Sequence, residues 1–146
     1  MKNFEYAQPR TEADVLEVLA SSPSSTALLA GGTDLVGLMK KMIVTPERVV
    51  DLGRVESMQS IETDPVGEVW IGAGVHLDEF LASSLTDPYP AVKQAIQGIA
   101  SQQLQAQGTI GGELLRRPRC WYFRDGYGLF AENGRRVVQG DNRYHA

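Results

Sequence analysis

The sequence has few of the residues that build metal centres and disulfides. Cys120 is the only cysteine in 146 residues, which excludes an intrachain disulfide and an iron–sulfur cluster held by four thiolates of this chain. We expect Cys120 to be a small buried hydrophobe. His76 and His145 lie far apart with no second ligand at metal-binding spacing, and no Ser/His/Asp or Cys/His arrangement is present. The sequence therefore predicts no metal site and no catalytic residue.

Positive charge and long apolar runs are also scarce. The 14 Lys and Arg residues are outnumbered by 18 Asp and Glu residues, and the net charge of −4 disfavours binding to nucleic acid. No apolar stretch has the length of a membrane span or a signal peptide. With 42% hydrophobic residues the chain has an ordinary globular composition, and we expect a cytoplasmic protein.

Helical and extended patterns alternate along the chain, which predicts a mixed α+β fold. Thr11 stands three residues before Asp14 and is expected to cap the first helix. Residues 64–67 predict the turn of a hairpin between strands at 60–63 and 68–73. Glycine-dense residues 108–115 predict a break in helical periodicity. The other predicted strands are residues 26–30, 49–52, 120–123 and 135–139. Apolar residues at helical spacing predict four helices: Val15, Leu16 and Leu19 in the first, Leu35, Leu38, Met39 and Met42 in the second, Leu77, Phe80 and Leu81 in the third, and Val92, Ala95, Ile96 and Ile99 in the fourth.

The first glycine loop, residues 30–35, stands between a predicted strand and a predicted helix. Gly31 and Gly32 allow a sharp turn and the close approach of a ligand. The helix start offers unpaired N–H groups and a partial positive charge, which suit a phosphate or pyrophosphate. Thr33 can cap the helix or donate its hydroxyl to a phosphate oxygen, and Asp34 is expected to point away. A tight turn with no ligand explains this loop alone equally well, and it has neither a Walker nor a Rossmann pattern.

A second glycine loop contains Gly108-Thr109-Ile110-Gly111-Gly112. It is expected to present exposed backbone amides and the hydroxyl of Thr109. Two such loops in one short chain can hold a pyrophosphate from two sides. A glycine-rich bend packed against a helix is the alternative for this loop, but the pair of loops is more specific than either one.

These motifs together resemble those of a known family. Residues 30–35 with the following Met39 and Lys40, then residues 49–52, 71–74 and 108–112, are similar in order and spacing to motifs of the FAD-binding subunits of molybdenum hydroxylases. That family includes the medium subunits of the xanthine dehydrogenase, carbon monoxide dehydrogenase and 4-hydroxybenzoyl-CoA reductase types. The resemblance implies a para-cresol methylhydroxylase-type FAD-binding fold with two small α/β subdomains, at residues 1–55 and 56–146. Because the family's FAD subunit is longer, we expect the second subdomain to be incomplete at its C-terminus.

The resemblance also implies a place for FAD, with its pyrophosphate at the two glycine loops. Gln105 and Ala106 stand where the family usually has Arg and Asn. Glu113 stands where it often has Asn, and a carboxylate there is expected to weaken flavin binding. The implied cofactor-binding residues are Ala30, Gly31, Gly32, Thr33, Asp34, Leu35, Gly74, Val75, Gly108, Thr109, Ile110, Gly111 and Gly112.

The function that the resemblance implies is electron transfer. In the family, electrons pass from a molybdopterin-binding large subunit through a [2Fe–2S] small subunit to FAD, and then to an acceptor such as NAD. We expect this chain to be such an oxidoreductase component, inactive alone. Two alternatives are a degenerate domain that serves only as an assembly surface and a free-standing flavin oxidoreductase.

Overall fold

The computed structural model of the chain describes residues 1–21, 25–99, 101–117 and 119–120. The chain forms two compact units, Met1–Arg116 and Arg117–Ala146, and every helix and strand below belongs to the first. Helices and strands are interleaved in it, which confirms the predicted α+β class. The strands predicted at residues 120–123 and 135–139 lie outside the described residues, apart from Cys120. Cys120 is exposed, so the prediction that it is buried was wrong.

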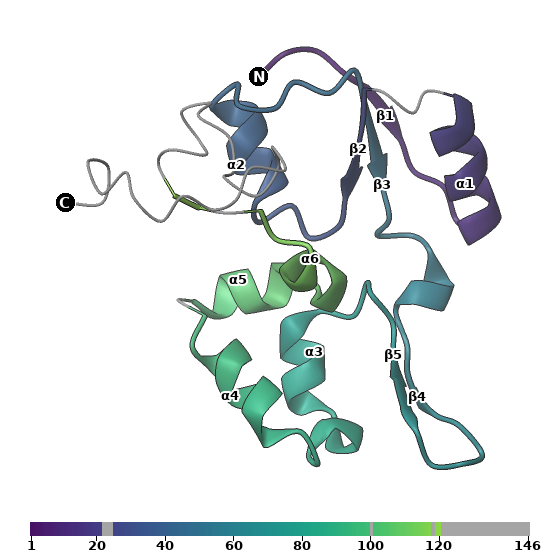
Figure 1. The fold of residues 1–146 in the computed structure, drawn as a ribbon, viewed down its shortest axis with the longest axis vertical. Helices are drawn as coiled ribbons and strands as arrows, with labels where there is room; N and C mark the ends of the chain where they lie inside the picture. Colours follow the sequence, from purple (N-terminus) through teal and green to yellow (C-terminus); the bar gives the residue numbers. More distant parts are fainter. Residues whose placement is uncertain (22–24, 100, 118, 121–146) are drawn as a thin grey trace, which may run out of the picture. The chain divides into compact units, whose positions relative to one another are not determined.

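The N-terminal part is a three-stranded parallel sheet with strand order β1-β3-β2 (Figure 1). Its strands are β1 (Glu5–Ala7), β2 (Thr26–Leu29) and β3 (Arg48–Asp51). Val49 and Val50 of the central strand are 1% and 0% exposed, because a parallel strand inside a sheet is covered on both faces. The strands run in one direction, so the loop after each strand emerges at the same edge. The first glycine loop, after β2, lies at this carboxyl edge.

Two helices connect these strands. In α1 (Glu12–Ser21) the amide of Asp14 donates to the hydroxyl of Thr11 at 3.2 Å, which confirms the predicted cap. The next helix, α2 (Leu35–Lys40), buries Leu38 and Met39 as predicted. Met42 was expected on the same apolar face, but it has a φ of 60° and is 53% exposed. The prediction for Met42 was wrong because the helix ends first, in a left-handed turn closed by the bond from Ile43 N to Leu38 O.

A hairpin opens the second part of the unit. It joins β4 (Ile61–Thr63) to β5 (Val69–Ile71) in an antiparallel pair, as predicted. The turn depends on Asp64, whose Oδ1 accepts hydrogen bonds from the amides of Val66 and Glu68 at 2.9 and 2.8 Å. These bonds to the charged form hold the pKa of Asp64 below its usual value.

Short helices follow the hairpin and share one small core with it. The α-helices are α3 (Leu77–Ala82), α4 (Pro90–Gln97), α5 (Gln102–Gln107) and α6 (Ile110–Leu114), and the 3₁₀ turns are η1 (Glu56–Met58) and η2 (Ser84–Thr86). The buried cluster is Val75, Leu77, Phe80 and Ile96, against which Ile61, Ile71, Leu81, Ile99 and Ile110 pack. Both predicted helices in this part are therefore present.

Besides the two 3₁₀ turns, one strand and two α-helices had no counterpart in the prediction. β1 is only three residues long, and α5 has Leu104 as its single large apolar residue, so neither shows a hydrophobic period. A cap marks the start of α5, because the hydroxyl of Ser101 accepts a bond from Leu104 N at 3.2 Å. The third element, α6, lies within residues 108–115, where a break was predicted. The break is present at Gly108 and Thr109, where α5 ends, but the prediction was wrong for Ile110–Leu114 because Thr109 caps a helical turn despite the two glycines.

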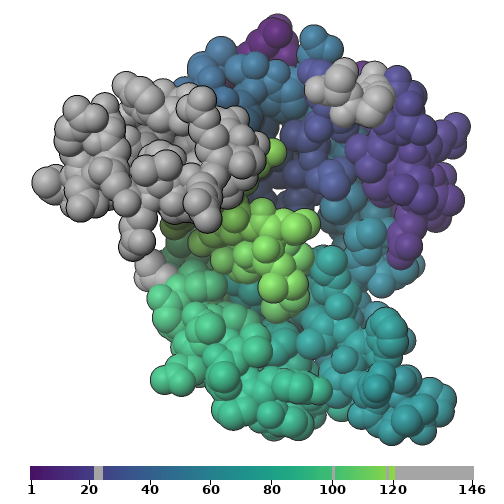
Figure 2. All heavy atoms as spheres, in the orientation of Figure 1, coloured from purple at the N-terminus to yellow at the C-terminus, as the bar shows by residue number. Residues whose placement is uncertain are grey.

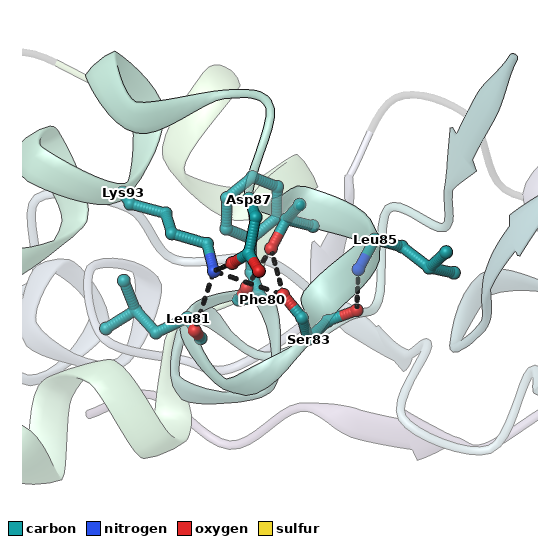
Figure 3. Close-up of polar contacts among 7 residues, drawn as sticks. Phe80, Leu81, Ser83, Leu85, Asp87 and Lys93 are labelled. Atoms are coloured by element: carbon teal, nitrogen blue, oxygen red, sulfur yellow. Dashed lines mark hydrogen bonds and ion pairs between the residues drawn. The ribbon is translucent and has the colours of Figure 1, made fainter.

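A lysine closes the carboxyl end of α3 (Figure 3). The Nζ of Lys93 donates to the carbonyls of Leu81 and Ser83 at 3.0 and 3.1 Å and lies 2.5 Å from the carboxylate of Asp87. The fully buried hydroxyl of Thr86 lies 2.6 Å from Phe80 O and 2.7 Å from Ser83 O. These polar groups satisfy carbonyls that the last turn of a helix leaves open.

Replacing Lys93 with Met should lower the free energy of unfolding by about 1–3 kcal/mol, because the carbonyl of Leu81 loses its donor and that of Ser83 keeps only Thr86, while the aliphatic stem remains. Urea unfolding measures this loss. The control is Lys2→Met, an exposed position near the N-terminus. Equal stability of the two variants would show that the ammonium contributes nothing to this part of the fold.

Candidate functional site

The two glycine loops meet in the structure through their backbones. An ideal Cβ placed on Gly31 would lie 1.6 Å from the carbonyl oxygen of Gln107 and 3.1 Å from the Cα of Gly108. No side chain fits in that space, so only glycine permits this approach. Gly32 is constrained for a different reason, since its φ of +71° is a left-handed conformation. Both glycines of the first loop are therefore explained by the fold itself.

The second loop is paired with the segment that precedes α3. His76 and Thr109 form an antiparallel bridge, flanked by bonds of 3.0 Å from Leu77 N to Gly108 O and from Ile110 N to Val75 O. Figure 2 shows green atoms of this region against the teal atoms of the second part of the unit. The structure therefore brings together three segments that the sequence analysis assigned to the site, containing Gly31, Val75 and Gly108.

Gly72 and Gly74 have another packing partner. Ideal Cβ atoms on them would lie 2.2 and 3.0 Å from the carbonyl oxygen of Met58, and Gly74 N donates to that oxygen at 2.7 Å. The glycine pattern of this segment is explained by its close contact with the end of η1.

The amides of the second loop are already used. Ile110 N donates to Val75 O, Gly111 N donates to Ala73 O at 2.8 Å, and Gly112 N donates to the hydroxyl of Thr109 at 3.1 Å. The expectation that this loop presents exposed amides was therefore wrong for these three groups. They donate hydrogen bonds to the segment before α3, at Ala73 and Val75, or to the Thr109 cap of α6. Of the loop's N–H groups, only that of Thr109 has no acceptor among the described residues.

The first loop is different. Within the described part of the chain, the N–H groups of Gly31, Gly32 and Thr33 have no hydrogen-bond acceptor, and the Thr33 hydroxyl makes no hydrogen bond either. The cap position of α2 is Asp34, whose side chain makes no cap bond. These donors are half-buried and lie next to Gln107, as the Gly31 contact shows. Free donors with fixed positions are what an anionic group requires.

The departures from the family pattern have local partners. Gln105 donates from Nε2 to the carbonyls of Ile96 and Ile99 at 3.2 and 3.3 Å, so it ties α5 to the end of α4. Glu113 forms an ion pair with Arg116, three residues later. The carboxylate of Glu113 is thus neutralised at close range, which reduces the repulsion that an acidic residue would exert on a phosphate.

A polar cluster at the carboxyl edge of the sheet had not been predicted. The hydroxyl of Tyr6 donates to Oδ2 of Asp51, to which Gln8 also donates at 2.9 Å, and Oδ1 accepts from Gly53 N at 2.8 Å. The bond to Asp51, with some burial and the nearby carboxylate charge, raises the pKa of Tyr6. The sequence feature that could have indicated this cluster is Asp51, an acidic residue directly after the apolar residues Val49 and Val50.

Neither a metal-binding cluster nor a membrane-spanning helix is found among the described residues. They contain no group of three His, Cys, Asp or Glu side chains placed to hold a metal ion. No helix in that part of the chain is both long and apolar enough to cross a bilayer.

The contact at Gly31 predicts that Gly31→Ala lowers the free energy of unfolding by about 1–3 kcal/mol in the absence of any ligand, because the new methyl group displaces Gln107. Gly37→Ala is the matched control. Its Cβ would have open space around it, so the change should raise helix stability by about 0.5–1 kcal/mol. Thermal and urea unfolding measure both effects, and a neutral Gly31→Ala would contradict the contact.

The pKa of Tyr6 should lie above its ordinary value of 10.0, and Asp51→Asn should bring it back toward that value. Because the folded pKa is raised, this interaction contributes its full stability below the unfolded pKa and loses it as the pH rises through the folded pKa. NMR of ring-labelled tyrosine, assigned with Tyr6→Phe, follows the titration. A midpoint that Asp51→Asn leaves unchanged would contradict the assignment.

The chain is similar to known proteins in sequence and in fold. A family model described as the FAD binding domain in molybdopterin dehydrogenase matches residues 2–123. The chain is 35% identical over 126 residues to the aldehyde oxidoreductase FAD-binding subunit PaoB of Escherichia coli K12, covering 86% of this chain and 39% of that protein. It is 30% identical over 112 residues to the carbon monoxide dehydrogenase medium chain of Hydrogenophaga pseudoflava, covering 76% of this chain and 39% of that one.

Solved structures agree with the sequence relatives. Carbon monoxide dehydrogenase from Hydrogenophaga pseudoflava, in a form lacking the Mo-pyranopterin moiety, matches with a TM-score of 0.73 and 30% identity over 77% of this chain and 39% of that chain. Quinoline 2-oxidoreductase from Pseudomonas putida 86 matches with a TM-score of 0.72 and 29% identity over 78% of this chain and 40% of that one. The chain thus spans about two fifths of the length of these relatives. It belongs to the family of FAD-binding domains of molybdopterin dehydrogenases.

Proposed function

We propose that this chain provides the FAD-binding part of an electron-transfer component in a molybdenum-containing dehydrogenase or hydroxylase. Family membership over residues 2–123 supports FAD as the cofactor. The relatives PaoB and the carbon monoxide dehydrogenase medium chain are subunits of oxidoreductases, which supports the assignment to this class. The observation that carries the proposal is the row of unpartnered N–H donors in the first glycine loop.

The first loop would hold the pyrophosphate of FAD. Among the described residues, the amides of Gly31, Gly32 and Thr33 and the hydroxyl of Thr33 have no hydrogen-bond partner and are available as donors. Ala30, Asp34 and Leu35 flank these donors. The six residues of α2 give only a small helix dipole, so the direct hydrogen bonds account for most of the attraction.

The second loop would contribute less hydrogen bonding than its sequence suggests. Its available donor is Thr109 N–H, since the amides of Ile110, Gly111 and Gly112 hold the loop in place. Through those bonds the loop is fixed against the segment containing Gly74 and Val75. Gly108 to Gly112 would therefore form a rigid wall of the FAD site rather than a second set of phosphate donors.

The chain's residues would bind and orient the cofactor, while FAD, when bound, supplies the capacity to accept and pass on electrons. We assign none of the site residues a role as general acid or base. The proposed function is thus electron transfer rather than substrate conversion, and we expect the chain to be inactive alone.

The proposed partners follow from the class of complex to which the relatives belong. Names such as "medium chain" and "FAD-binding subunit" indicate assemblies of several polypeptides. We propose a molybdopterin-binding large subunit and a [2Fe–2S] small subunit as partners, and NAD or another small molecule as the final acceptor. The engaged amides of the second loop favour one alternative, a domain that keeps the fold but serves only in assembly.

FAD titration tests the placement of the cofactor. The full chain should bind FAD, and Thr33→Val should weaken that binding about fivefold, the equivalent of one hydrogen bond of about 1 kcal/mol. Thr45→Val, at an exposed position after α2, is the matched control and should leave the affinity unchanged. Flavin fluorescence or equilibrium dialysis gives the dissociation constants.

Absence of FAD binding by the wild-type chain would favour the assembly-only alternative. Wild-type affinity in a folded Thr33→Val variant would contradict the placement of the pyrophosphate at the first loop, while leaving FAD binding itself intact.

A further inference from the structure

The hairpin of β4 and β5 leaves one of its two faces open. Ile61 and Ile71 lie opposite each other and pack against the buried core of this part of the chain. Because side chains alternate along a strand, the next opposed pair, Glu62 and Trp70, points to the other face. Glu62 is exposed, and Trp70, at 64%, is the most exposed aromatic side chain among the described residues. A tryptophan that folding leaves in water is available to anchor a partner, since Trp is enriched among the residues that carry most of the binding energy at interfaces.

Two further carboxylates lie on the same side of the hairpin as Trp70. Oδ2 of Asp64 accepts a hydrogen bond from Nε1 of Trp70 at 3.4 Å, which places this carboxylate at the edge of the indole ring. Glu68 is joined to Asp64 by the bond of 2.9 Å from Asp64 N to Glu68 O, and it stands two residues before Trp70, so it belongs to the same face. We call Glu62, Asp64, Glu68 and Trp70 the hairpin face.

The charge around the hairpin face is all of one sign. Between Arg54 and Lys93 the sequence has no Lys or Arg but seven of the 18 Asp and Glu residues. In the rest of the chain the 14 Lys and Arg residues outnumber the acidic residues that remain, so the negative charge of the protein is concentrated in this segment. No described residue forms an ion pair with the three carboxylates of the hairpin face. They therefore create a local negative field around an exposed aromatic ring.

This combination of an indole and carboxylates indicates the chemistry of the partner. A guanidinium group stacks on the face of an indole and forms paired hydrogen bonds with carboxylates, whereas an ammonium group is a point charge without that planar fit. Nucleic acid, an anionic lipid surface or the same face of a second copy would each bring negative charge against it, which is unfavourable. We propose that the hairpin face is a docking surface for an arginine-bearing segment of a partner polypeptide, with the guanidinium stacked on Trp70 between the carboxylates.

Calorimetric titration of the full chain with hexa-arginine amide at physiological ionic strength tests the charges of this surface. The wild-type chain should bind hexa-arginine more tightly than hexa-lysine, because only the guanidinium both stacks and pairs in two places. Glu62→Gln/Glu68→Gln should weaken the binding of hexa-arginine about fivefold. Glu17→Gln/Glu47→Gln removes the same charge from exposed positions outside the hairpin and is the matched control. It should have the smaller effect, since salt screens charges that do not touch the peptide.

Two substitutions of Trp70 test the stacking. Trp70→Leu keeps an apolar side chain but removes the aromatic face, so it should weaken the binding of hexa-arginine about three- to fivefold. Trp70→Phe keeps a smaller aromatic face and should retain part of the affinity. The indole N–H signal of Trp70 in an NMR spectrum, assigned by its loss in Trp70→Phe, should shift when the peptide is added to the wild-type chain. None of these measurements requires FAD, because no residue of the hairpin face belongs to the proposed FAD site.

Several results would overturn the proposal. Equal losses of affinity in Glu62→Gln/Glu68→Gln and Glu17→Gln/Glu47→Gln would show a general attraction by net charge, and no binding of hexa-arginine by the wild-type chain would rule out the surface altogether. Wild-type affinity in a folded Trp70→Leu variant would show that the indole takes no part. A dimer of the wild-type chain in sedimentation equilibrium that Trp70→Leu dissociates would assign the hairpin face to a second copy of this chain instead.

Discussion

The close approach of Gly31 to the carbonyl of Gln107 is the contact on which the arrangement of the site depends. The first glycine loop ends a parallel strand, and Gln107 ends a short helix far along the chain. Their backbones meet at a distance that leaves no room for a side chain. Since Gly108 and Ile110 are in turn bonded to the segment before α3, one backbone contact aligns all three glycine segments.

Because of this packing, the two glycine loops differ in how their backbone amides are used. The amides of the second loop donate hydrogen bonds to the cap of α6 and to the carbonyls of Ala73 and Val75, so this loop is a rigid support. Within the described residues the first loop keeps its N–H donors free, and it is there that we propose the pyrophosphate binds. The side chains at two departures from the family pattern have local partners, Gln105 at the carbonyls of Ile96 and Ile99 and Glu113 at Arg116.

Sequence patterns were informative where one residue or one period determines the local structure. Asp64 specified the hairpin turn, and the spacing of Leu77 and Phe80 specified α3. They failed where the outcome depends on distant contacts. The polar helix α5 has no apolar period, and the left-handed turn at Met42 interrupts a stripe that looks continuous. The use of the amides of Ile110 and Gly111 could not be foreseen either, because their acceptors, the carbonyls of Val75 and Ala73, belong to a segment far back along the chain.

The order of the parallel sheet has a consequence for how the protein is made. β1 and β2 pair only with β3, which lies between them although it is the last of the three in sequence. A nascent chain that has emerged as far as α2 therefore carries two strands with no partner, and their edges stay open until Arg48–Asp51 leaves the ribosome. Until β3 emerges, the unpaired edges of β1 and β2 are open to pairing with other chains.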